Sequence, residues 1–124
     1  MLDAEAAVIN TLTPLYPGIA ISSELPIDAV LPRLRISRLG GTLDIYGHID
    51  KPNIYVEAWA NTKAEAWDLA STSLLAMINN LTGAQFSDGI ITFVQPSNGI
   101  SWAPDPDTLK PRYTYSVVLT THPN

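Results

Sequence analysis

Cysteine is absent from this chain of 124 residues, which excludes disulfide frameworks, thiolate catalysis and metal sites built on cysteine. Basic residues are few, because 7 Lys and Arg stand against 12 Asp and Glu and give a formal net charge of −5. So few basic residues argue against a nucleic-acid-binding domain that contacts phosphate backbones. Long apolar runs are also missing: the longest, residues 74–78 and 117–119, fall far short of the roughly 20 residues that a membrane span needs.

The composition that remains is that of a folded chain. Hydrophobic residues make up 46% of it and charged residues 15%, a balance that argues against intrinsic disorder. A chain of this length supports one hydrophobic core, so we expect a single domain over residues 1–124. The first seven residues carry two acidic side chains, Asp3 and Glu5, where a secretory signal would be basic, and no apolar segment follows them. We therefore expect no cleaved secretory signal.

Two segments have the pattern of helices. Asp3 stands before an alanine-rich apolar run, which predicts a capped helix over residues 3–15. Thr62 and Glu65 have the spacing of a capping box, and apolar residues then recur at helical spacing as far as Leu81. The second helix would be about 28 Å long, and we expect it to lie across a sheet.

Five segments have the pattern of strands: residues 19–22, 33–39, 54–60, 89–94 and 112–121. The expected breaks between them are Gly40-Gly41 after the second, Pro52-Asn53 before the third, and Pro96 with Asn98-Gly99 after the fourth. We expect residues 97–111, which hold three further prolines, to form no regular structure. The order of elements predicts an α+β fold, a mainly antiparallel β-sheet with a long helix packed on one face and a shorter N-terminal helix.

Patterns of catalytic, metal and cofactor sites do not stand out. His48 and His122 have no partner at metal-ligand spacing within one element. Asp105 and Asp107 resemble the start of a calcium loop, but neither the required glycine nor the terminal glutamate follows them. We therefore expect no enzyme, no metal site and no cofactor. An acid–base pair among the carboxylates of residues 44, 50 and 57 remains an open alternative.

The basic residues gather at one place only, at Arg33, Arg35 and Arg38. On a strand, Arg33 and Arg35 would share one face and Arg38 would lie on the other. We interpret these arginines as a solvated strand face or as ion-pair partners.

Two tryptophans are candidates for contacts between subunits. Trp59 would share a strand face with Glu57, so it becomes an interface residue if the long helix covers only the other face. Trp102 lies in the proline-rich segment, where a large side chain either folds back onto the core or docks into a neighbour. The sequence leaves these two alternatives open.

The order of several motifs is similar to a known family. The motifs are a strand ending in Arg38-Leu39-Gly40-Gly41, an acidic turn with Asp50, the strand Ile54-Tyr55-Val56-Glu57-Ala58-Trp59-Ala60, and the helix start Thr62-Lys63-Ala64-Glu65-Ala66. With the final strand from Tyr113 to Thr121, this order resembles the tail terminator proteins of long-tailed bacteriophages, of the siphophage type. The likeness is best over residues 31–81.

The resemblance implies a structural virion protein. Such a protein assembles as a ring, typically a hexamer, on the head-proximal end of the tail tube, stops tube polymerisation and provides a docking surface for the head connector. The implied partners are other copies of the chain, the tail tube protein and the head–tail connector or stopper protein. DNA would pass through the ring without sequence-specific binding, no membrane is involved, and assembly would take place in the host cytoplasm.

Our candidate interface residues for this role are Tyr46, Trp59, Trp102, Leu109 and Arg112. Two alternatives remain. The first is a connector or stopper subunit of the phage neck, which would bind the connector but not the tube. The second, of another class, is a small ligand-binding or enzymatic α+β domain whose site is assembled from distant residues.

Overall fold

The sheet dominates this computed structural model, which describes residues 1–24, 30–44 and 49–123. Its strands are β1 Ala20–Ser22, β2 Arg33–Leu43, β3 Asp50–Trp59, β4 Gln85–Phe86, β5 Gly89–Trp102 and β6 Arg112–His122. They lie in the order β1-β2-β3-β6-β5-β4. β1 and β2 are parallel and the other neighbouring pairs are antiparallel, so the predicted α+β fold with a mainly antiparallel sheet is confirmed.

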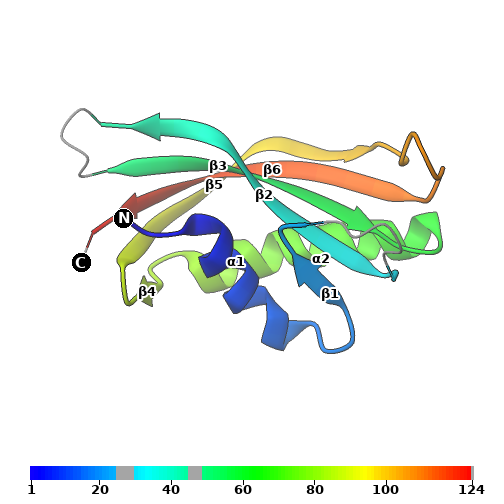
Figure 1. Cartoon of the computed structure of the whole chain (residues 1–124), viewed down its shortest axis with the longest axis horizontal. Coiled ribbons are helices and arrows are strands. Elements are labelled where there is room, and N and C mark those ends of the chain that lie inside the picture. The colour runs from blue at the N-terminus through cyan, green and yellow to red at the C-terminus, as the bar shows by residue number, and fades with distance from the viewer. Residues whose placement is uncertain (25–29, 45–48, 124) are drawn as a thin grey trace.

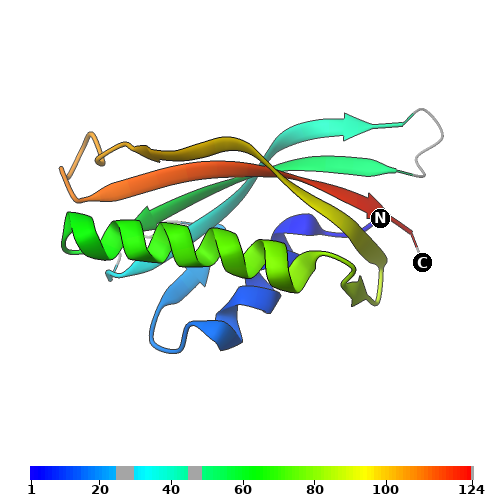
Figure 2. The same ribbon diagram turned by 180° about the vertical axis from the view of Figure 1, so that it is seen from behind.

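Both predicted helices are present with their predicted caps. α1 is Ala4–Leu12, followed by a short 3-10 helix, Thr13–Leu15, and α2 is Lys63–Leu81. The Asp3 carboxylate accepts from the Ala6 N–H at 3.1 Å, and the Thr62 hydroxyl accepts from the Glu65 N–H at 3.2 Å. α1 and α2 lie on the same side of the sheet (Figures 1 and 2). We call this side the helical face and the opposite side the open face.

The core lies between the sheet and the helices. Alternate residues of the central strands point into it, as the period of two in the sequence predicts. Its fully buried members include Leu34, Ile36, Ile54, Val56, Tyr115, Val117 and Leu119 from the sheet and Val8, Leu12, Met77 and Leu81 from the helices. One polar contact lies inside this core, where Tyr115 Oη and Ser73 Oγ are 2.7 Å apart.

The glycine pair does not end β2, contrary to our expectation. Gly40 and Gly41 have φ values of +76° and +124°, and the register between β2 and β3 shifts between Arg38 and Gly41. This is a β-bulge, which the glycines make at little steric cost and after which the strand continues to Leu43.

Pro52-Asn53 is not a turn either, since both residues lie inside β3. Pro52 pairs with Gly41 of the bulge, and the pairing of β3 with β6 skips from Asp50 to Asn53. Proline lacks the N–H that a ladder requires. The bulge on one side and the interrupted ladder on the other therefore accommodate Pro52 in the strand.

β5 also continues through its predicted end. It runs past Pro96 and Asn98-Gly99 to Trp102, so the expectation of no regular structure holds only for residues 103–111. Its short neighbour β4 pairs with it only at Gly89 and Ile90. Strands with a free edge tolerate proline, and the register of β5 against β6 shifts on both sides of Asn98.

Candidate interaction surfaces

The loop of residues 103–111 folds over the open face at one end of the sheet. Trp59 Nε1 donates to Asp105 Oδ2 at 3.3 Å, and the Arg112 guanidinium lies 5.6 Å from the centre of the Trp59 ring. Trp59 is consequently only 2% exposed. It is a buried part of the protomer, and little of its surface is left for a partner.

Asp105 organises this loop. Its carboxylate accepts hydrogen bonds from the backbone N–H groups of Asp107 and Thr108 as well as from Trp59. These bonds, the one from Asp107 first, hold the pKa of Asp105 below its ordinary value in spite of partial burial. The pair that resembles a calcium loop in the sequence is thus an Asx turn.

Two arginines contact one buried glutamate beside this loop, and a third arginine lies on the same strand face. Arg112 Nη1 binds Glu57 Oε2 at 2.9 Å, and Arg35 Nε lies 3.6 Å from Glu57 Oε1. Arg33 donates from Nη1 to Ser22 Oγ at 3.3 Å, while its Nε is buried without a partner among the described residues. The interpretation of Arg35 as an ion-pair partner is confirmed, and two guanidinium groups share the one carboxylate of Glu57.

An aromatic group lies on the helical face at the same end. Trp67 of α2 meets Tyr113 of β6 edge to face at 5.4 Å, and Trp102 packs on the same Tyr113 ring at 5.1 Å. Lys63 Nζ lies 4.7 Å from the Trp102 ring centre. Trp67 is 49% and Trp102 43% exposed, so Trp102 both contacts its own chain and presents much of its ring to solvent.

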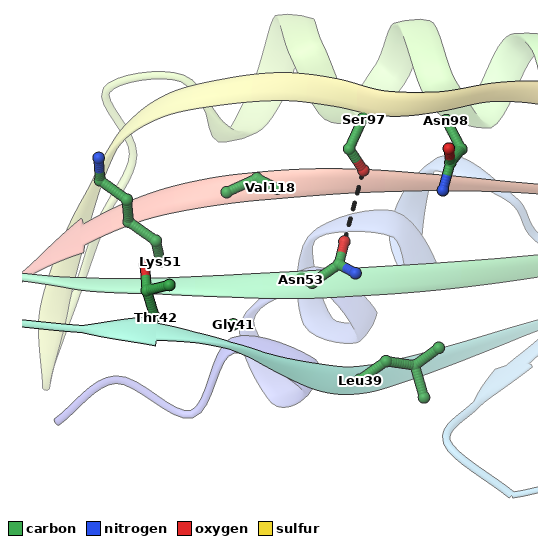
Figure 3. A pocket seen from close by; sticks show the side chains of 8 residues that line it. All are labelled: Leu39, Gly41, Thr42, Lys51, Asn53, Ser97, Asn98 and Val118. Atoms are coloured by element: carbon green, nitrogen blue, oxygen red, sulfur yellow. Dashed lines mark hydrogen bonds between the residues drawn. The ribbon is translucent and has the colours of Figure 1, made fainter.

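A shallow hollow of about 420 Å³ lies further along the open face. Figure 3 shows its lining residues on four strands: Leu39, Gly41, Thr42, Lys51, Asn53, Ser97, Asn98 and Val118. Ser97 Oγ donates to Asn53 Oδ1 at 3.4 Å, a bond between β5 and β3 that crosses over β6. Lys51 is the single ionisable group of this lining, so the hollow itself holds no acid–base pair.

Two of the three carboxylates considered for acid–base chemistry, Asp50 and Glu57, lie on opposite faces of the sheet. Asp50 points to the helical face, where Arg38 Nη1 and Nη2 bind its two oxygens at 2.7 Å each. This bidentate contact raises the pKa of the Arg38 guanidinium. Glu57 lies on the open face with Arg112, and Arg38 lies on the other face from Arg35, as predicted.

Neither a metal-binding cluster nor a membrane-spanning helix is present in the described part of the chain. In residues 1–24, 30–44 and 49–123, no three side chains of His, Asp or Glu come together where they could hold a metal ion. Over the same ranges, no helix has the length and apolar character that crossing a membrane requires.

The five predicted interface residues have different surroundings. Leu109, 78% exposed with φ +59°, projects from the loop, and Trp102 is half-exposed beside Tyr113. Arg112 is mostly covered by Glu57 and the Ala103 carbonyl, Trp59 is buried, and Tyr46 lies outside the described residues, as does His48. Their role as interface residues remains a prediction.

Sequence reasoning missed the partners that surround Trp102. Trp67 and Tyr113 join it only because the β5–β6 hairpin extends to Trp102, opposite Tyr113, and because α2 begins beneath this end of the sheet. The sequence indicates that Trp67 lies on a helix, but it does not indicate the contact between Trp67 and Tyr113.

The fold and these surfaces define a class of protein: a small α+β interaction domain whose exposed features are aromatic and charged surface groups. The model of the phage tail termination protein family matches residues 1–99. The chain therefore belongs to the phage tail termination protein family, and it is a structural protein of the virion tail.

A solved structure shows the same fold. The gp17 protein of bacteriophage SPP1 is similar over 94% of this chain and 85% of that chain, with a TM-score of 0.51 and 18% sequence identity. None of the curated proteins compared with this sequence matches it.

Proposed function

We propose that the chain assembles as a ring, a hexamer, on the head-proximal end of the tail tube, where it stops tube polymerisation and offers the docking surface for the head connector. Residues 1–124 act in this role as one domain, assembled in the host cytoplasm. The observation that carries the proposal is membership of the phage tail termination family.

The size of the chain supports a ring. A compact chain of 124 residues has a radius of gyration of roughly 14 Å, so several copies are needed to cover the end of a tube. Closed rings form from heterologous contacts, in which each copy uses two different surfaces. DNA then passes through the ring without being bound by sequence.

The exposed residues at one end of the molecule support contacts there. Trp67, Trp102 and Leu109 are large apolar side chains with much of their surface free, and aromatic residues are enriched among those that dominate binding energy at interfaces. We assign Trp102 and Leu109 to the contacts with other copies or with the tube.

The experiment that tests this function is deletion of the gene from the phage that carries it. Tail lengths are measured in electron micrographs of the lysate, with a plasmid copy of the gene as the control. We expect overlong, headless tails beside filled heads, and normal tails when the plasmid is present. Tails of normal length that stay unjoined would instead indicate a connector subunit, and unchanged virions would contradict both roles.

A further inference from the structure

A patch on the open face and a patch on the helical face carry opposite charge, and we propose that these two patches bind each other in successive copies. In this arrangement, Arg33 and Arg35 on the open face of one copy contact Glu65 and Asp68 on α2 of the next. The inference rests on the proposed ring and names the contact that builds it.

The open face is basic around Arg33 and Arg35 although the chain as a whole is acidic. Four of the 7 Lys and Arg lie on it, namely Arg33, Arg35, Lys51 and Arg112. The acidic groups beside them are Glu57, which is buried under Arg112, Asp105 from the loop, and Asp44, which lies in the same hollow as Lys51. At the end of the open face that holds Arg33, Arg35 and Arg112, three cations therefore stand against the carboxylates of Glu57 and Asp105.

The helical face is acidic. Its exposed or half-exposed acidic groups are Asp3, Glu5, Glu65, Asp68 and Asp88, and the Asp50 carboxylate is neutralised by Arg38. Lys63 is the other cation on the described part of this face. When the open face of one copy meets the helical face of the next, groups of opposite charge come together. This complementarity favours the encounter of the two copies and fixes their orientation.

The acids of α2 are the ones available to a partner. Glu5 already accepts from the Arg38 N–H at 2.7 Å, and Asp88 accepts from the Asp3 N–H at 3.4 Å. The carboxylates of Glu65 and Asp68 have no hydrogen-bond or ion-pair partner among the described residues, and both are exposed.

Trp67 stands between these two acids in the sequence and is half-exposed. Its ring offers an apolar centre and a face on which a guanidinium group can stack. An aromatic residue with charged groups around it is the usual composition of an interface centre and rim.

The geometry also explains why the contact would build a ring. The arginines and the α2 acids lie on opposite faces of the sheet, so they cannot meet within one copy. Each copy has one of each surface, and a contact between unlike surfaces leaves both outer copies able to bind another. Such heterologous contacts continue until a ring closes.

The absence of native cysteine gives a direct test. In phage complemented with Arg35→Cys plus Asp68→Cys, oxidised virions are analysed on a non-reducing gel. We expect a ladder of cross-linked oligomers of this chain, whereas either single variant stays monomeric. A double variant without a ladder in intact virions would overturn the inference, and so would a dimer from a single variant, because it would indicate like surfaces in contact.

Charge reversal gives a second test if the cysteine variants do not assemble. Arg33→Glu or Asp68→Lys alone should lower the yield of joined virions by more than about tenfold, since like charges would then meet, and the combination should restore it. Lys110→Glu, an equal charge change in the loop, is the matched control, and thermal unfolding verifies that each variant folds. Failure of the combination to restore virions would overturn the contact.

These outcomes separate the contact from the function. Overlong tails after gene deletion together with no ladder would leave the terminator role in place and remove the contact. Binding of Arg33 and Arg35 to a short DNA duplex at physiological salt, lost in Arg33→Glu but with virion yield unchanged, would assign the open face to nucleic acid and would also overturn the proposal.

Discussion

Asp50 is a buried carboxylate, 4% exposed, and it forms an ion pair with one partner, Arg38. The Arg38 guanidinium binds both of its oxygens, and the Asp50 carbonyl accepts from the Thr121 hydroxyl at 3.1 Å. Removing one member of a buried pair leaves an uncompensated charge, which costs far more than a pair at the surface contributes.

We therefore predict that Arg38→Met lowers the free energy of unfolding by about 3 kcal/mol in urea denaturation. The matched control is Arg35→Met, because Glu57 keeps its shorter contact to Arg112 and the cost should stay below about 1 kcal/mol. Equal losses in the two variants would contradict this account of the pair.

Tyr115 gives a prediction for alkaline pH. Burial raises the pKa of its phenol, although the hydrogen bond with Ser73 opposes this effect. The folded protein thus holds the phenolic proton more tightly than the unfolded chain does. The resulting stabilisation is complete below the ordinary tyrosine pKa of about 10 and is lost as pH rises above it.

Tyr115→Phe should accordingly cost about 1 kcal/mol at neutral pH, through the lost hydrogen bond, and should flatten the fall in stability above pH ~10. Urea denaturation at a series of pH values measures both effects. Val117→Ala, at a buried residue of the same strand that carries no ionisable group, is the control: it should lower stability at every pH and leave the alkaline slope as in the unmodified chain. An unchanged slope in Tyr115→Phe would count against the assignment.

Hydrogen bonds between residues close in the sequence could be predicted, whereas the contacts between Arg38 and Asp50 and between Tyr115 and Ser73 could not. The caps Asp3 and Thr62 are three residues from the N–H groups they bind, so spacing alone indicates them. Arg38 and Asp50 meet only through the register of β2 and β3, and Tyr115 meets Ser73 across the packed core.

At the scale of elements, the bulge in β2 shifts the register between β2 and β3 and lets β2 continue to Leu43. A Cβ at Gly41 would collide with the Lys51 carbonyl and crowd Pro52, and its φ is positive. Gly40 also has positive φ, but a Cβ there would meet open space. The two glycines consequently have different tolerance to substitution.

Gly41→Ala should lower the free energy of unfolding by more than about 2 kcal/mol, from backbone strain together with the collision. Gly40→Ala, the control, should cost about 1 kcal/mol from positive φ alone. Thermal and urea unfolding of the two variants measure the difference. If Gly41→Ala proved as stable as Gly40→Ala, β3 would not approach β2 as closely as the structure shows.

The extents of β2, β3 and β5 were the main errors of the sequence-based prediction. Their central residues alternate clearly, but Gly40-Gly41, Pro52-Asn53 and Pro96 were interpreted as ends. In each case, a bulge or a register shift absorbs the residue that normally breaks a ladder. Such irregularities depend on the neighbouring strand, which local sequence does not specify.

At the scale of the whole molecule, the proposed ring depends on surfaces that are completed only between copies. Strand alternation in the sequence already predicts that Arg33 and Arg35 share one face. The fold adds that this face lies opposite the helices, and therefore opposite Glu65 and Asp68 of α2. Trp59 was chosen as an interface candidate from its strand face, and the sequence did not indicate that the loop of the same chain covers it.

Substitution of Trp102 tests its proposed role in contacts with other copies or with the tube. Trp102→Ala should reduce assembly of joined virions strongly while costing the isolated chain about 1 kcal/mol, from its contact with Tyr113. Phe93→Ala, at another exposed aromatic residue of β5, is the matched control and should assemble normally. If Trp102→Ala left both assembly and stability unchanged, Trp102 would not be an interface residue.

The most direct test of the terminator role is to titrate the purified chain into polymerising tail tube protein and to measure tube lengths by electron microscopy. The account predicts that mean length falls as the ratio of chain to tube protein rises, and that a label on an engineered cysteine marks one end of each tube. Tube lengths independent of the added chain, or label along the whole shaft, would contradict it.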